Sequence, residues 1–285
     1  MEAKKKGIMR SDGMRRFLKN RLSVLGIIIL LVFVLAAVFA DFVAPYPYDQ
    51  QDLYATYQSP SAAHPFGTDS TGRDQLSRVI YGGRASLAIG FLATGIALVL
   101  GMILGCVAGF YGGRYDSVIM RVIDMMLAIP SVLLAIVITS ALGTGLFNLT
   151  LAMGISSIPS YARMTRASIM SIRGSEYVEA ARLSGCSDLR IITRHVLPNI
   201  LAPLIVQVTL GLGLTILTAS GLSFLGLGVQ PPTPEWGSML AAARGDIRNY
   251  PYLLVFPGCA IALVVLACNM VGDGLRDALD PRMRS

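Results

Sequence analysis

Residue types that support catalysis or nucleotide binding are scarce in this sequence. No Gly-Lys pair occurs, so the GxxxxGK[ST] loop that holds nucleotide phosphates is absent. All four lysines lie within the first nineteen residues, which leaves no lysine for Schiff-base chemistry beyond them. His64 and His195 have no metal-ligand neighbour at helical spacing, and no GxSxG nucleophile elbow occurs. We therefore predict no ATP site, cofactor, metal or catalytic residue in this chain.

Cysteines and buried acids add no chemistry of their own. The four cysteines show neither CxxC spacing nor zinc-ligand neighbours, which indicates no disulfide framework. They are Cys106, Cys186, Cys259 and Cys268. Asp124 is a carboxylate beside an apolar run, three residues after Arg121, and we expect a local ion pair between the two. A proton relay is the alternative, but no second ionisable residue lies deeper in an apolar run.

The composition is that of a membrane protein. Of 285 residues, 54% are hydrophobic and only 14% are charged, and the mean hydropathy is +0.61. Soluble globular chains carry about 25% charged residues, so this balance excludes a disordered chain and argues against an ordinary soluble enzyme. The length accommodates six spans of about 20 residues each with connecting loops.

Six apolar runs are predicted to cross the membrane as helices. They are Leu22–Ala40, Ala85–Tyr111, Met125–Leu142, Phe147–Ala162, Ile200–Leu222 and Leu253–Met270. In the second run Gly101, Gly105 and Gly109 fall on one helical face, and small residues at that spacing let helices approach closely in lipid. Pro130 is expected to kink the third span. The boundary between the third and fourth spans, near Thr144, stays open.

Charge asymmetry predicts the orientation. With the N-terminus inside, the inner segments hold 19 Lys/Arg and the outer segments hold five. The positive-inside rule then places both termini in the cytoplasm, whereas five spans would lower the contrast. The first run is longer than the 7–15 residues of a signal-peptide core, so we expect it to be uncleaved. The predicted organisation is a tail (1–21), a first span with an outer segment (22–84), a five-span core (85–272) and a second tail (273–285).

The largest inner loop, residues 161–199, contains signals for two short helices. Ser175 is a good N-cap, Glu176 suits the first turn, and Gly185 stands where a terminating glycine belongs, which predicts a helix at residues 176–184. Its narrow apolar patch comprises Tyr177, Ala180 and Ala181. A second helix is predicted at residues 188–197, capped by Ser187 and ending at Pro198. From these residues alone the first helix either fits a partner's cleft or lies as a lid on lipid headgroups.

The outer segment before the sixth span also has a helix-start signal. Thr233, Pro234 and Glu235 provide a cap, a proline at the first helical position and an acidic residue next. We expect a short helix from Pro234 to Arg244, with Trp236 at the membrane interface.

The inner loop resembles the EAA loop of permease subunits of bacterial ATP-binding-cassette importers. Glu179-Ala180-Ala181, Gly185 and Leu197-Pro198 carry the resemblance, and His195 stands where the family usually has isoleucine. Further stretches are similar to the dipeptide, oligopeptide and nickel permease group, closest to its "C" permease. They are 66–69, 72–74, 76–78, 81–82, 231–237, 256–258, 269–277 and 279–281.

The resemblance implies an all-α membrane protein with six transmembrane helices and the type I importer (MetI-like) fold, plus an extra N-terminal helix and outer segment. The residues it implies for coupling to the ATPase subunit are Tyr177, Glu179, Ala180, Ala181, Gly185, Leu197 and Pro198. It implies a bacterial inner-membrane permease that pairs with a homologous permease, two ATP-binding subunits that hold ATP and Mg, and an extracytoplasmic substrate-binding protein.

The implied cargo is di- or oligopeptides. Nickel or another small solute is the alternative within the group. A self-contained channel or secondary carrier, and an intramembrane enzyme, are the rivals outside it. The lack of ionisable residues within the runs argues against an ion-coupled carrier, and the runs also lack the Ser/His or two-Asp constellation that an intramembrane enzyme needs.

Overall fold

The computed structural model describes residues 16–279, and the regular elements within that range are helices. The long ones are α2 (Arg21–Val38), α4 (Gln75–Tyr111), α7 (Leu146–Ile172), α10 (Leu197–Phe224) and α12 (Tyr252–Leu279). The shorter ones are α3 (Ala40–Val43), η1 (Leu53–Ala55), α5 (Gly113–Leu127), α6 (Ser131–Leu142), α8 (Glu176–Leu183), α9 (Asp188–Ile191), η2 (Ile192–Val196), α11 (Trp236–Ala243) and η3 (Arg244–Asp246). The predicted all-α class is confirmed.

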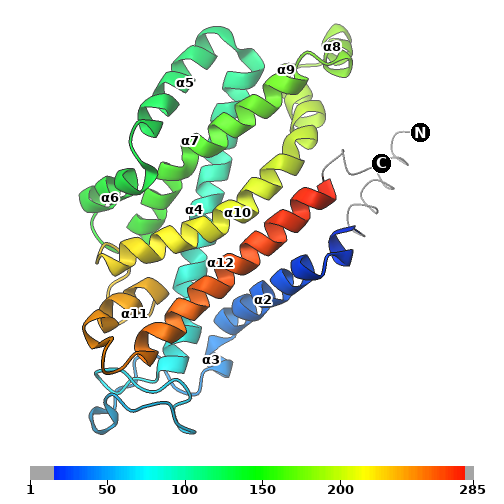
Figure 1. Ribbon diagram of the computed structural model, residues 1–285. Helices are drawn as coiled ribbons and strands as arrows, with labels where there is room; N and C mark the ends of the chain where they lie inside the picture. Colours follow the sequence, from blue (N-terminus) through cyan, green and yellow to red (C-terminus); the bar gives the residue numbers. More distant parts are fainter. Residues whose placement is uncertain (1–15, 280–285) are drawn as a thin grey trace.

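The long helices lie side by side, with the functional segments at opposite ends (Figure 1). The start of α2, the end of α12 and the short helix α8 lie toward one end, which we call the inner end. Helices α3 and α11 and the loops before α4 lie at the other, outer end. This arrangement agrees with the alternation expected from the predicted spans.

Four helices are long and apolar enough to cross a membrane, namely α2, α4, α10 and α12, the third together with the short helices before it. The bent pair α5 and α6 makes a fifth candidate. Helix α7, the predicted fourth span, is 27 residues long and so has the length to cross, but its sequence is more polar. By length and composition together, the structure supports four of the six predicted spans, and a fifth if the bent pair is one span. The remaining one, the predicted fourth span in α7, has the length alone.

The predicted third span is two helices rather than one kinked helix. α5 and α6 meet at 88° across a break that ends at Pro130. Proline lacks a backbone N–H and disfavours helical geometry in the residue before it, so the chain stops one helix and begins another here. Helix α5 also starts at Gly113, well before the predicted start at Met125.

Three other helices extend past their predicted limits. α4 begins at Gln75 because Asp74 caps it, accepting a hydrogen bond from the backbone N–H of Ser77 at 2.7 Å. α7 continues to Ile172, so the predicted loop boundary at Tyr161 lies inside a helix. α12 continues to Leu279 and includes part of the predicted tail. Hydropathy marks the part of a helix that lies in lipid, and these three helices continue beyond their apolar runs.

A seam of glycines joins α4 to α7 and confirms the predicted close approach. A Cβ added at Gly101 would lie 2.5 Å from the Cβ of Tyr161, and one at Gly105 would lie 2.5 Å from the carbonyl oxygen of Ala162. A Cβ at Gly109 would lie 3.0 Å from the Cβ of Ile169. A side chain at any of these three positions would come too close to atoms of α7. Glycine therefore lets the main chain of α4 lie directly against α7.

Two ion pairs also fasten α5 to α7. The Arg166 guanidinium donates to both carboxylate oxygens of Asp116, at 2.5 and 2.6 Å. Arg163 donates to Asp124 at 2.6 Å. The predicted pairing of Asp124 with Arg121 on its own helix is therefore wrong, because a neighbouring helix supplies a closer arginine.

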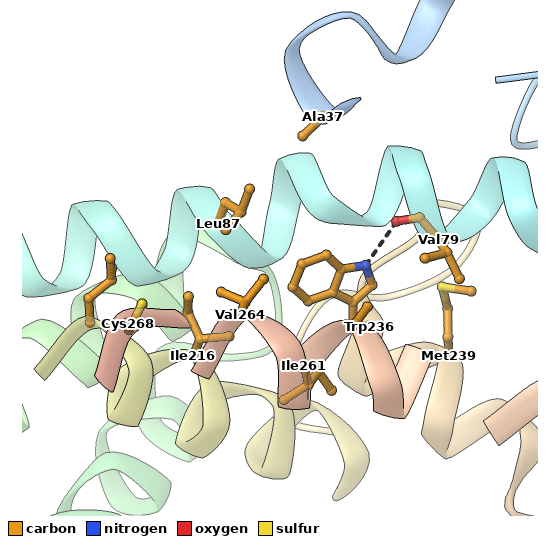
Figure 2. Packing of buried hydrophobic residues seen from close by; sticks show 11 residues of the cluster. Ala37, Val79, Leu87, Ile216, Trp236, Met239, Ile261, Val264 and Cys268 are labelled. Carbon is orange, nitrogen blue, oxygen red and sulfur yellow. Dashed lines mark hydrogen bonds between the residues drawn. The ribbon is translucent and has the colours of Figure 1, made fainter. Parts of the chain in front are cut away.

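Trp236 is buried at the outer end and does not lie at the membrane interface as predicted. Its side chain is fully buried, and its indole N–H donates to the carbonyl of Val79 at 2.9 Å (Figure 2). Ala37 of α2 and Ile261 of α12 belong to the same cluster. A buried tryptophan needs an acceptor for its N–H, and a backbone carbonyl near the start of α4 provides it.

Glu235, rather than Thr233, caps the outer helix α11. Its carboxylate accepts from the backbone N–H groups of Gly237 and Ser238, at 2.9 and 2.8 Å, and from the hydroxyl of Ser86 at 3.0 Å. Glu235 is only 1% exposed, and these donors satisfy its buried carboxylate. The helix consequently starts at Trp236, two residues after the predicted start.

The family-like stretch at residues 66–69 ties the outer loops to α12. Phe66 stacks on Phe256 with ring centroids 3.7 Å apart, and the Tyr252 hydroxyl donates to the carbonyl of Thr68 at 3.0 Å. Burial raises the pKa of Asp69, but hydrogen bonds from the backbone N–H groups of Thr71 and Arg73 and the Arg73 guanidinium outweigh it, leaving that pKa below its usual value. These contacts make the outer loops part of the folded body.

Substituting alanine along α4 tests the seam. Gly105→Ala places a methyl group against Ala162 and Thr165 and should destabilise the assembled protein by about 1–3 kcal/mol, the usual effect of overpacking. Gly95→Ala is the matched control, because nothing lies within 4 Å of its added Cβ. Thermal unfolding of the purified protein measures both. Equal midpoints for the two variants would contradict a backbone-to-backbone seam.

Candidate functional site

The connection between α7 and α10, residues 173–196, forms the candidate site. Helix α7 ends at Ile172, α8 runs from Glu176 to Leu183, and α9 runs from Asp188 to Ile191. Figure 1 shows α8 at the tip of the inner end, beyond α9. The predicted first loop helix is confirmed to within one residue. The chain therefore presents a short helix away from the main bundle.

The start of α8 is set by the backbone of Ser175. Its carbonyl accepts from the N–H groups of Val178 and Glu179, at 2.9 and 3.1 Å. The Ser175 hydroxyl donates backward to the carbonyl of Ile172 at 2.6 Å, so it makes no side-chain cap. Glu176 and Glu179 lie in the first turn, where the helix dipole favours negative charge. The predicted cap position is right, although its hydroxyl has another partner.

The end of α8 is a Schellman motif centred on Gly185. The N–H of Cys186 donates to the carbonyl of Ala181 at 3.1 Å, and that of Gly185 donates to Arg182 at 3.0 Å. These are the 6→1 and 5→2 bonds of the motif. Gly185 adopts φ +72°, which glycine reaches without a Cβ penalty. The motif stops the helix and turns the chain back toward the bundle.

One face of α8 is anchored in the bundle by Val178. Val178 is fully buried in a cluster with Phe110 of α4, Ile169 of α7 and Ile200 of α10. Partly buried Ala181 packs against the same cluster. Further contact comes from Arg182, whose guanidinium carbon lies 5.5 Å from the ring centroid of Phe110. The predicted apolar patch missed Val178, although this valine is what holds the helix in place.

The opposite face of α8 is exposed and carries large apolar side chains. Leu183 is 90% exposed and Tyr177 is 42% exposed, and Glu179 and Ala180 are exposed beside them. Leu189, in α9, is 72% exposed. The sequence prediction missed both leucines. The available signal for Leu183 was its helical position, about 140° around the helix from Val178.

The predicted site residues divide into two groups. Ala181 and Leu197 pack inward in the cluster around Val178. The exposed members are Tyr177, Glu179, Ala180, Gly185 and Pro198, and the Tyr177 hydroxyl accepts a hydrogen bond from the Asn199 amide at 3.4 Å.

The second predicted helix does not end at Pro198. α9 passes through the π-helical turn η2 directly into α10, with Pro198 in the first turn of α10. Proline has no backbone N–H to donate, so one helical hydrogen bond is missing at the junction of η2 and α10.

No metal-binding arrangement occurs among the residues from Arg16 to Leu279. No three His, Cys, Asp or Glu side chains there lie close enough together to hold an ion. The chemistry available at α8 is therefore that of a docking surface, with apolar contact from Leu183 and Tyr177 and charge from Glu179 and Arg182.

Substitution at Gly185 tests how the site is held. Gly185→Ala meets no atom within 4 Å, so its cost is the left-handed backbone alone, about 1–2 kcal/mol. Amide hydrogen exchange in residues 176–187 should then speed up roughly five- to thirty-fold. Gly185→Asn is the control, since asparagine tolerates this conformation. Exchange that is unchanged in both variants would show that the turn does not hold α8.

Two family models together match most of the chain. Residues 97–285 match "Binding-protein-dependent transport system inner membrane component", and residues 9–60 match "N-terminal TM domain of oligopeptide transport permease C". The resemblance to "C" permeases is thereby confirmed. In solved structures, a chain of the inward-facing MetNI methionine ABC transporter superposes with a TM-score of 0.58 at 18% identity, covering 71% of this chain and 97% of that chain. This likeness shows the predicted type I importer fold.

Curated relatives are similar over almost their full length. The dipeptide permease DppC of Alkalihalophilus pseudofirmus is 47% identical over 274 residues, which is 96% of this chain and 90% of the relative. The di/tripeptide permease DppC of Pseudomonas aeruginosa is 48% identical over 275 residues, 94% and 91%. The glutathione permease GsiD of Escherichia coli is 44% identical over 271 residues, 95% and 89%. The chain therefore belongs to the family of inner-membrane components of binding-protein-dependent transport systems.

Proposed function

We propose that this chain is one of two permease subunits of an ATP-binding-cassette importer and that α8 is its coupling helix. The observation that carries the proposal is the two-sided character of α8. Val178 fixes one face in the bundle, while Leu183 presents an apolar surface at the tip of the molecule. A soluble partner that covered Leu183 would bury apolar area, whereas water leaves it exposed.

The partner is an ATP-hydrolysing subunit with a groove that receives α8. Glu179 and Ala180 lie on the exposed face, and the alanine allows close approach of the two backbones. Val178 shares a buried cluster with residues of α4, α7 and α10, so a displacement of α8 reaches these helices through that cluster. ATP and Mg²⁺ belong to two such partner subunits. The ATP-bound state opens the path outward to accept cargo from a binding protein, and hydrolysis returns it inward.

The orientation follows from the same geometry. The start of α2 and the end of α12 lie at the end of the molecule that carries α8 (Figure 1). An ATPase partner is cytoplasmic, so both termini are cytoplasmic in this proposal. The excess of Lys/Arg in the inner segments, 19 against five, supports the same orientation.

The cargo we propose is a di- or oligopeptide. The relatives described above are named for dipeptide, di/tripeptide and glutathione transport. All three cargoes are short peptides with free charged groups. A binding protein outside the membrane delivers the peptide, and this chain with its homologous partner permease forms the path.

Leu183→Asp tests the coupling role. Losing one buried leucine contact, about 1.5–3 kcal/mol, should weaken retention of the ATPase subunits roughly ten- to hundred-fold and uncouple ATP hydrolysis from uptake. Because Leu183 is 90% exposed in this chain, the variant should fold normally. Co-purification and peptide uptake in proteoliposomes provide the two measurements.

Leu53→Asp is the matched control, an exposed leucine at the outer end. It should leave ATPase retention unchanged. Normal retention and normal coupled uptake in Leu183→Asp would overturn the docking role of α8, and uptake by the permease without any ATPase subunit would overturn the importer itself.

A further inference from the structure

Helix α7 contacts α4, α5, α6 and α10 and leaves one side of its inner half open. Its Tyr161 and Ala162 meet the glycines of α4, and its Arg163 pairs with Asp124 of α5. The Tyr161 hydroxyl donates to the carbonyl of Gln207 in α10 at 3.5 Å. Ser160 and Arg163 are exposed on the remaining side, between α5 and α10. The inner half of α7 therefore exposes polar side chains between α5 and α10.

Four polar side chains form a continuous line across that face. The Gln207 amide donates to the Ser160 hydroxyl at 3.4 Å, and Arg163 donates to Asp124 at 2.6 Å. Ser160 and Arg163 are three residues apart on α7 and so are neighbours on the helix surface. We call Asp124, Ser160, Arg163 and Gln207 the polar strip.

The polar strip does not suit contact with lipid. Ser160 lies within the predicted fourth span, and Gln207 lies in the apolar run of α10. The Arg163 and Asp124 side chains remain 57% and 60% exposed although they are paired. Arg163 and Asp124 flank the predicted spans at their inner ends, whereas Ser160 and Gln207 lie within apolar runs. A hydroxyl or amide that faces acyl chains is costly, and in membrane proteins such groups face a water-filled path or another polar group.

The outer half of the same α7 face is closed by apolar side chains. Leu149 and Met153 precede Ser160 by eleven and seven residues, which places them on its helical face. Both are buried in a cluster with Ala135 of α6 and Leu222 of α10. The open face therefore begins at Ser160 and continues toward the inner end.

From this geometry we propose that the polar strip lines the inner half of the cargo path and contacts the peptide directly. The inference rests on the proposed peptide-import function. Gln207 and Ser160 exchange hydrogen bonds with peptide amides, which offer both donors and acceptors. Arg163 binds the terminal carboxylate and Asp124 the terminal ammonium, so a zwitterionic peptide matches both ends of their ion pair.

Cysteine accessibility tests whether the strip faces water. Ser160→Cys and Gln207→Cys are placed in a Cys259→Ala background, because Cys259 is exposed. The assembled transporter is treated with a cationic, membrane-impermeant thiosulfonate reagent from the inner side. Both cysteines should react, and a saturating dipeptide should slow the reaction. Leu214→Cys, on an exposed apolar side of α10, is the control that should stay unreactive.

Labelling at the Leu214→Cys rate would overturn the proposal, since the strip would then be covered by lipid or by the second permease. Rapid labelling that no peptide slows would overturn the peptide contacts. Loss of the ATPase subunits from the unmodified complex would instead count against the proposed importer, so the two failures are distinguishable.

Selectivity for peptide ends tests the ion pair. Arg163→Gln should lower uptake of a free dipeptide by about tenfold, the effect of losing one charge-assisted hydrogen bond, and should affect its C-terminal amide much less. Asp124→Asn should likewise lower uptake of a free dipeptide and should affect an N-acetylated dipeptide, which has no terminal ammonium, much less. ATPase retention should be unchanged in both.

Asp116→Asn is the matched control, because the Asp116–Arg166 pair joins the same two helices but is only 21% and 27% exposed. It should lower thermal stability without changing the preference between free and blocked peptides. An equal loss of free and blocked peptide uptake in Arg163→Gln and Asp116→Asn would reduce the strip to a structural clamp and overturn the proposal.

Discussion

The close approach of α4 and α7 is the constraint on which the other features depend. Three glycines let the two main chains touch, which fixes the depth and rotation of α7. The rotation directs Arg163 and Arg166 toward the carboxylates of α5 and leaves Ser160 on the open side. The depth sets where α7 ends and hence where α8 begins. In lipid no hydrophobic effect drives two helices together, so such packing must come from shape.

The two ends of the bundle use the remaining contacts differently. At the outer end, Trp236 and Glu235 are buried and fully hydrogen-bonded, and aromatic stacking joins the loops to α12. At the inner end, α8 has one buried anchor and an exposed surface. A rigid outer end and a projecting inner helix are what a subunit needs if it receives cargo on one side and force on the other.

Local signals allowed some of this to be predicted from the sequence. The spacing of Gly101, Gly105 and Gly109 predicted the seam, and Ser175 with Gly185 predicted the bounds of α8. Those features depend on residues close together in the chain. Other features depend on partners that only the fold brings near. Examples are the carbonyl of Val79 for Trp236 and the guanidinium of Arg163 for Asp124.

Other misses have a different physical origin. A two-turn helix is too short for its periodicity to show which face meets its own bundle and which is exposed, so Val178 and Leu183 were not separated. Pro130 predicts a bend within one helix, whereas α5 has already ended at Leu127 and Pro130 stands at the N-cap of α6. The limits of α4 and α7 were missed because both helices continue where hydropathy falls.

The length of α4 has a thermodynamic consequence. Its 37 residues form a rod of about 55 Å, which starts beside the outer loops at Gln75 and ends beneath α8 at Phe110 and Tyr111. A tilt of such a rod is one variable shared by both faces of the membrane. If binding at one end favours a tilt that changes the affinity at the other end, then binding at that other end changes the affinity at the first end by the same factor. The tilt of one helix is enough to couple the two ends.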